Sequence, residues 1–118
     1  MRLIANIKQE SSELKRLMIF DSGDGVYLFG YDTEIDSGGL WDEWYETIED
    51  AMESCMEEYG VDKNEWKQIP NPLDNCVHDW IEPVRVKGRE IGKPERGKLE
   101  KLVNGNWVDI NDVNSENK

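Results

Sequence analysis

Residues 14–32 read LKRLMIFDSGDGVYLFGYD, with two β-type runs on either side of a short polar segment. The runs 14–20 and 26–32 are rich in branched and aromatic residues, which favour strands. The segment DSGDG between them holds two glycines and two aspartates, which accept the positive backbone angles of a hairpin loop. We therefore predict an antiparallel hairpin over this stretch.

Other β-type segments precede and follow this hairpin. Residues 2–8, RLIANIK, place apolar and polar side chains in partial alternation, which predicts a partly buried strand. Residues 65–69 predict a short strand, and residues 78–88 an extended segment in which Pro83 implies an edge or a bend. Residues 98–110 predict a second hairpin, because they contain an Asn-Gly pair of the kind favoured in type I′ turns.

Residues 47–60, TIEDAMESCMEEYG, carry the pattern of one amphipathic helix. Apolar side chains recur at helical spacing at Ile48, Ala51, Met52, Cys55 and Tyr59. Thr47 followed by Asp50 resembles a capping box, and Gly60 suits the C-terminal cap. We therefore predict a helix over 47–59.

Together these elements predict the α+β class, with an antiparallel β-sheet of about six strands packed on one main α-helix. The chain has 118 residues, which fits one domain and leaves little room for a second. We expect a single domain over 1–110 and a flexible C-terminal tail over 111–118.

The net charge of −12 has its source in the middle of the chain. Residues 32–66 hold 13 acidic side chains and one basic side chain, and eight of the acids lie within 41–60. On the predicted helix the acids fall away from the apolar stripe and form a solvated surface. Glu57 and Glu58 lie near its C-terminal end, where the helix dipole favours a cation, so helix stability does not explain them.

Three aromatic residues, Trp41, Trp44 and Tyr45, lie among these acids just before the helix. Aromatic anchors combined with acidic charges are the composition expected of a surface that binds a basic protein. The predicted partner-binding residues are Trp41, Asp42, Glu43, Trp44, Tyr45, Glu46, Glu49, Asp50, Glu53, Glu57 and Glu58. We expect a basic protein as the partner, and neither nucleic acid nor a membrane.

A basic segment follows over 84–102, with seven basic and three acidic residues. It contains no aromatic residue that could stack on nucleic-acid bases. We expect it to complement the acidic helix, either within the fold or in a dimer, which leaves both a monomer and a homodimer open.

Residues 32–43 have the length of a calcium-binding loop. The oxygen ligands of such a loop would be Asp32, Glu34, Asp36 and Glu43. Ser37 stands where the loop requires glycine, and a β-type run rather than a helix precedes it. We interpret the segment as a solvated acidic loop.

Cys76, His78 and Asp79 lie close together in the sequence. They support the alternative interpretation, an uncharacterised small bacterial domain with a ligand or catalytic site at these residues. A zinc site requires more nitrogen or sulfur ligands than one His and two Cys readily supply, and a lone His is more often structural. We expect no metal, no cofactor and no enzymatic activity.

No apolar run approaches the roughly 18 residues that span a bilayer, and residues 1–10 are too polar for a signal peptide. Cys55 and Cys76 fit no metal spacing such as C-x-x-C. We expect a cytoplasmic protein with two free thiols.

In size, acidity, cytoplasmic character and absence of a catalytic motif, the chain resembles the immunity proteins of bacterial toxin systems. The resemblance is one of overall character and rests on no diagnostic motif, so it assigns no residue a role. It implies an inhibitor that neutralises a basic partner such as a nuclease-type toxin. Phage or plasmid inhibitors that mimic nucleic acid share this character, and a scaffold whose acidity serves solubility alone is a third interpretation.

Overall fold

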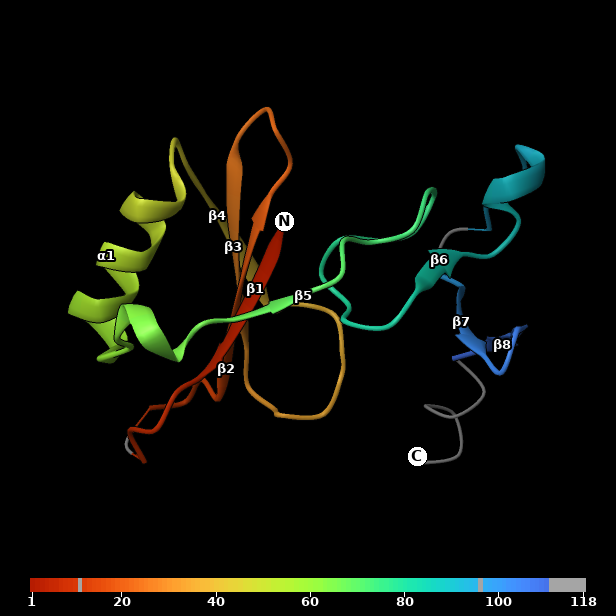
Figure 1. Cartoon of the computed structure of the whole chain (residues 1–118). Coiled ribbons are helices and arrows are strands. Elements are labelled where there is room, and N and C mark those ends of the chain that lie inside the picture. Colours follow the sequence, from red (N-terminus) through yellow and green to blue (C-terminus); the bar gives the residue numbers. More distant parts are fainter. Residues whose placement is uncertain (11, 96, 111–118) are drawn as a thin grey trace. The chain divides into compact units, whose positions relative to one another are not determined.

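The computed structural model describes residues 1–10, 12–95 and 97–110, without the side chain of Glu90. The chain divides into two compact units, Met1–Asn71 and Pro72–Lys118. The first unit holds a five-stranded sheet and the main helix, and the second holds a three-stranded sheet (Figure 1). The α+β class and the antiparallel pairing are confirmed, but the strands lie in two sheets rather than one of about six strands. A single domain over 1–110 stays a prediction, and the tail over 111–118 lies outside the described residues.

The sheet of the first unit has the order β4-β3-β2-β1-β5, and each strand is antiparallel to its neighbours. Its strands are β1 Arg2–Asn6, β2 Arg16–Asp21, β3 Val26–Tyr31, β4 Trp41–Tyr45 and β5 Lys67–Ile69. The predicted N-terminal strand, the hairpin over 14–32 and the short strand near 65–69 are confirmed. Strand β4 was not predicted, because its run WDEWY lacks the alternation of apolar and polar residues that identifies a strand.

One face of this sheet carries the core of the unit. Leu17 and Ile19 of β2 and Val26 and Leu28 of β3 are almost completely buried on it. Burial of each such side chain adds about 1.5–3 kcal/mol to the free energy of unfolding. A register slip of one residue would turn the apolar side chains of the slipped strand to the opposite face, so this apolar set favours the observed pairing of β2 with β3.

Helix α1, Ile48–Tyr59, contacts β2, β3 and β4 and buries Ala51 and Cys55 in that core (Figure 1). Both predicted caps are confirmed. The Thr47 hydroxyl accepts a hydrogen bond from the Asp50 amide at 3.1 Å, and Gly60 ends the helix in the left-handed conformation at φ 68°. The short 3-10 helix η1, Lys63–Glu65, leads from the helix to β5.

Two buried arginines lie among the strands of the first unit. The Arg2 Nε donates to the Pro70 carbonyl oxygen at 2.8 Å. The Arg16 Nη1 donates to the Glu34 carbonyl oxygen at 2.8 Å, and its guanidinium carbon lies 5.0 Å from the centre of the Tyr31 ring. Arg16 therefore holds the loop that connects β3 to β4 and helps to place the start of the edge strand.

The second unit contains the strands β6 Val84–Val86, β7 Leu99–Val103 and β8 Asn106–Asp109 in the order β6-β7-β8. A short 3-10 helix, η2 Arg89–Ile91, follows β6. Asn104 and Gly105, which join β7 to β8, have positive φ angles of 51° and 83°. These angles confirm the predicted hairpin and its Asn-Gly turn. The extended segment expected over 78–88 forms a strand only at Val84–Val86.

Gly30 of β3 provides the space in which the Trp41 ring of β4 packs. The two residues are partners across the strands, and a Cβ at Gly30 would overlap the indole ring. We predict that Gly30→Ala lowers the free energy of unfolding by about 1–3 kcal/mol, because the ring must move out of its packed position. Chemical denaturation measures this loss. In a Trp41→Val background the further loss from Gly30→Ala should shrink to about 0.5 kcal/mol or less, and equal losses in both backgrounds would show that the ring is not the cause.

Candidate functional site

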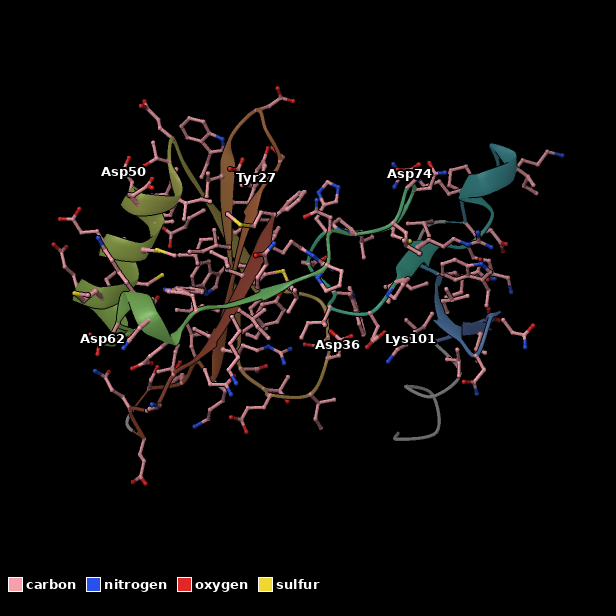
Figure 2. All side chains as sticks on the ribbon, viewed as in Figure 1. Tyr27, Asp36, Asp50, Asp62, Asp74 and Lys101 are labelled. Atoms are coloured by element: carbon pink, nitrogen blue, oxygen red, sulfur yellow. The ribbon has the colours of Figure 1, made fainter. Side chains whose placement is uncertain are left out.

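The eight carboxylates of residues 41–58 are all exposed. They are Asp42, Glu43, Glu46, Glu49, Asp50, Glu53, Glu57 and Glu58, and we call them the acidic surface. Within residues 1–10, 12–95 and 97–110, none of them takes part in an ion pair. Figure 2 shows acidic side chains that project from α1 away from the sheet, Asp50 among them. The carboxylates therefore face solvent, and no cation among the described residues of the first unit pairs with them.

The acidic surface comes from two elements that meet at one edge of the sheet. Asp42 and Glu43 belong to β4, which pairs with β3 alone among the described strands. Glu46 lies in the short connection, and the other five acids lie on α1. Residues 17–62 contain no Lys or Arg, whereas Lys67 lies on β5 at the opposite edge. The order of the strands thus separates an acidic edge from an edge that carries a lysine.

The three aromatic residues of β4 differ in exposure. Trp41 and Tyr45 are half-buried and pack against the core, and the Tyr45 hydroxyl donates to Ser54 Oγ at 3.0 Å. Trp44 keeps 55% of its surface exposed. Its ring lies against the hairpin loop, since a Cβ at Gly25 would overlap the indole. Of the three aromatic anchors that we predicted, Trp44 is the one most available to a partner.

A shallow recess lies between the hairpin loop and the start of α1. Its volume is about 420 Å³, and four carboxylate residues line it: Asp21, Asp24, Glu46 and Glu49. No lysine or arginine lines it. Asp21 and Asp24 were absent from the predicted site because the hairpin loop lies far from α1 in sequence. The acidic composition of the loop was visible, but its position beside the helix depends on the β2–β3 pairing.

Glu43 of β4 and Glu58 of α1 act on the same buried groups although they lie 15 residues apart in sequence. Burial is the main cause that raises the pKa of the Cys55 thiol to about 12, followed by the negative charges of Glu58 and then Glu43. Burial also raises the pKa of Tyr45, and both carboxylates add to that shift. The fold therefore concentrates charges that the sequence places on separate elements.

Three cations of the second unit, Arg85, Lys87 and Lys98, pair with acids of that unit. Arg85 Nε lies 2.7 Å from Glu100 Oε1, and the Arg85 guanidinium carbon lies 3.8 Å from the centre of the Trp107 ring. Further ion pairs join Lys87 to Asp109 at 2.9 Å and Lys98 to Glu95 at 3.4 Å. The expectation that the basic segment complements the acidic helix, within the fold or in a dimer, stays a prediction. Arg96 lies outside the described residues.

No protein-family model matches the chain. Comparison with curated proteins and with solved structures also returns no match. We therefore infer function from the residues and the geometry alone.

Cys76, His78 and Asp79, the residues of the alternative site, lie in an irregular segment before β6. The Cys76 side chain is buried and His78 is exposed. In the part of the chain that the structure describes, no group of three His, Cys, Asp or Glu side chains could hold a metal ion. The described acids of the segment 32–43, which has the length of a calcium loop, belong to no such group. A ligand or catalytic site at Cys76 stays a prediction.

Neither cysteine is in a disulfide. None of the helices among the described residues combines the length and the apolar character that a membrane crossing requires.

The Cys55 thiol should resist alkylation in the folded protein. Its pKa is raised to about 12 from an ordinary value of 9.0, so the reactive thiolate is scarce at pH 8. In a Cys76→Ser variant, iodoacetamide should therefore label Cys55 at least ~100-fold more slowly than it labels the same variant in denaturant. Mass spectrometry over time measures both rates. Labelling of the folded variant at the denatured rate would contradict the burial of this α1 thiol in the core of the first unit.

Proposed function

We propose that the protein is a non-enzymatic binding module that holds a basic protein partner on the acidic surface. One observation carries the proposal: eight carboxylates are exposed on β4, on α1 and in the connection between them, and no cation of the first unit's described residues pairs with them. Like charges on one surface repel each other and destabilise the folded state. A basic partner removes this repulsion on binding.

The acidic surface suits rapid capture more than strong individual contacts. A single exposed ion pair contributes only about 0.2–1 kcal/mol, so no one carboxylate determines affinity. A surface of one sign, however, speeds association with a partner of the opposite sign. Trp44, which is half-exposed beside Asp42 and Glu43, adds the kind of aromatic anchor on which binding energy concentrates. The carboxylates of β4 would thus speed the approach of the partner, and Trp44 on the same strand would contribute binding energy.

Within this class we propose an immunity or inhibitor protein, with a nuclease-type toxin as its basic partner. A cleft that binds nucleic acid is lined with lysine and arginine to hold phosphates, and carboxylates on a rigid surface can occupy the same cations. The recess of four carboxylate residues beside α1 is large enough to accept a lysine or arginine side chain. We propose that the protein binds its partner in the cytoplasm. Its two cysteines are free thiols, which is the usual state of cysteine in a reducing compartment.

The test is charge reversal on the helix. The variant Glu49→Lys, Glu53→Lys, Glu57→Lys replaces three exposed carboxylates of the acidic surface. Basic proteins retained by the immobilised wild-type chain at low salt and released at high salt are identified first, and the affinity of each is then measured. We predict that the triple reversal weakens binding at least ~100-fold, because attraction becomes repulsion across the interface.

A matched variant controls for overall charge. Glu10→Lys, Glu13→Lys, Asp74→Lys makes the same change in net charge at exposed positions outside the acidic surface. We expect it to weaken binding less than ~5-fold, since charges outside the contact surface act on the partner only through long-range attraction, which salt screens. Equal weakening by the two variants, or binding that survives the helix reversal, would overturn the proposed function.

A further inference from the structure

We propose that the outer edge of β4 is the docking position for an extended basic segment of the partner, which pairs with β4 and extends the five-stranded sheet by one strand. This inference rests on the proposed function and specifies how the partner is held. It depends on three properties of β4: a free backbone edge, the charge along that edge, and the side chains on its two faces.

The free edge follows from the strand order. Strand β4, Trp41–Tyr45, is the terminal strand, and it pairs with β3 through Val26–Gly30. Among the described residues no strand lies on its other side. A terminal strand presents a row of N–H and C=O groups that another chain can pair with. Peptide-binding domains use such edges, where backbone hydrogen bonds give affinity and alternate side chains give specificity.

The charge along β4 determines which kind of segment can pair with its outer edge. Asp42 and Glu43 on the strand, and Glu46 just after it, are exposed. A second copy of the chain that paired edge to edge through β4 would place carboxylates opposite carboxylates, which destabilises a cross-strand pair. A segment that carries lysine or arginine would instead gain attraction from each of them. The acids therefore oppose self-association and favour a basic strand.

The faces of β4 add side-chain contacts. Asp42 and Trp44 point to one face of the sheet and are paired with Phe29 and Tyr27 of β3. The Tyr27 and Phe29 rings are stacked, with centres 6.4 Å apart, so an aromatic row continues from β3 to Trp44. An incoming segment with alternating basic and apolar residues could place its apolar side chains beside Trp44 on this row.

The other edge of the same sheet lacks these properties. Strand β5 has only three residues, and it carries Lys67. Nearby, Lys8 Nζ lies 3.9 Å from Glu65 Oε1, so a carboxylate on that side already has a cation close to it. A basic segment would therefore be repelled from β5 and attracted to β4.

The test uses two synthetic probes of equal charge. The first is a ten-residue peptide of alternating lysine and valine, and the second is the peptoid with the same side chains in the same order. The peptoid has no backbone N–H, so it cannot complete the hydrogen bonds of a strand. We expect the peptide to bind the wild-type chain at low salt at least ~10-fold more tightly than the peptoid, because several backbone hydrogen bonds are lost together. Amide hydrogen exchange within 41–45 should slow when the peptide binds.

Each other outcome overturns the inference. Equal affinity for the two probes, with unchanged amide exchange in β4, would show that charge alone holds the basic ligand, and the proposed function would still stand. Slowed exchange on α1 but not on β4 would move the docking position to the helix. If neither probe binds, edge pairing is rejected, and the helix-reversal experiment with the natural partner decides the proposed function separately.

Discussion

The packing of α1 against β2 and β3 is the interaction on which the rest of the first unit depends. The helix offers a narrow apolar stripe that includes the fully buried Ala51 and Cys55, and the strands offer Leu17, Ile19 and Leu28. Once that stripe is buried, the acids at the other positions of the helix must face water. The same packing sets the helix beside β4, whose own acids lie along the sheet edge. A solvent-facing acidic surface is therefore a direct consequence of how the core is built.

The arrangement of charge distinguishes between the interpretations of the acidity. Solubility requires net charge, but it does not require the absence of Lys and Arg from residues 17–62. Protection of an edge strand from self-pairing accounts for Asp42 and Glu43, but it does not account for Glu53, Glu57 and Glu58 on the helix. A surface that captures a basic partner accounts for both groups. The core offsets the repulsion in the free protein, and the proposed basic partner would remove it in the complex.

Local sequence signals predicted most of the helices and strands, but fewer of the contacts between them. The helix was predictable because Thr47, Gly60 and the apolar spacing agree, and the hairpins because Asn104-Gly105 and DSGDG determine their turns. Strand β4 was not, because its exposed Asp42, Glu43 and Trp44 follow one another without alternation. Its strand conformation is imposed by pairing with β3, which is a tertiary effect.

Relations between distant residues were the less predictable part of the site. The exposed positions of the five acids on α1 followed from helical periodicity. The recess that joins Asp21 to Glu49 depends on strand register, and the pairing of Arg85 with Glu100 depends on which strands meet. The division of the strands between two sheets was unpredictable for the same reason. Alternation of apolar and polar residues identifies a strand, but it does not show which other strand pairs with it.

The central claim is that the carboxylates of the acidic surface are not neutralised within the folded chain. The most direct measurement is the free energy of unfolding as sodium chloride is raised from about 0.02 to about 0.5 M at pH 7, a range over which the screening length falls several-fold. We predict that the free energy of unfolding rises with salt, because screening relieves the repulsion among exposed like charges. A free energy of unfolding that stays constant or falls would show that cations of the chain already compensate these carboxylates, and would contradict the account.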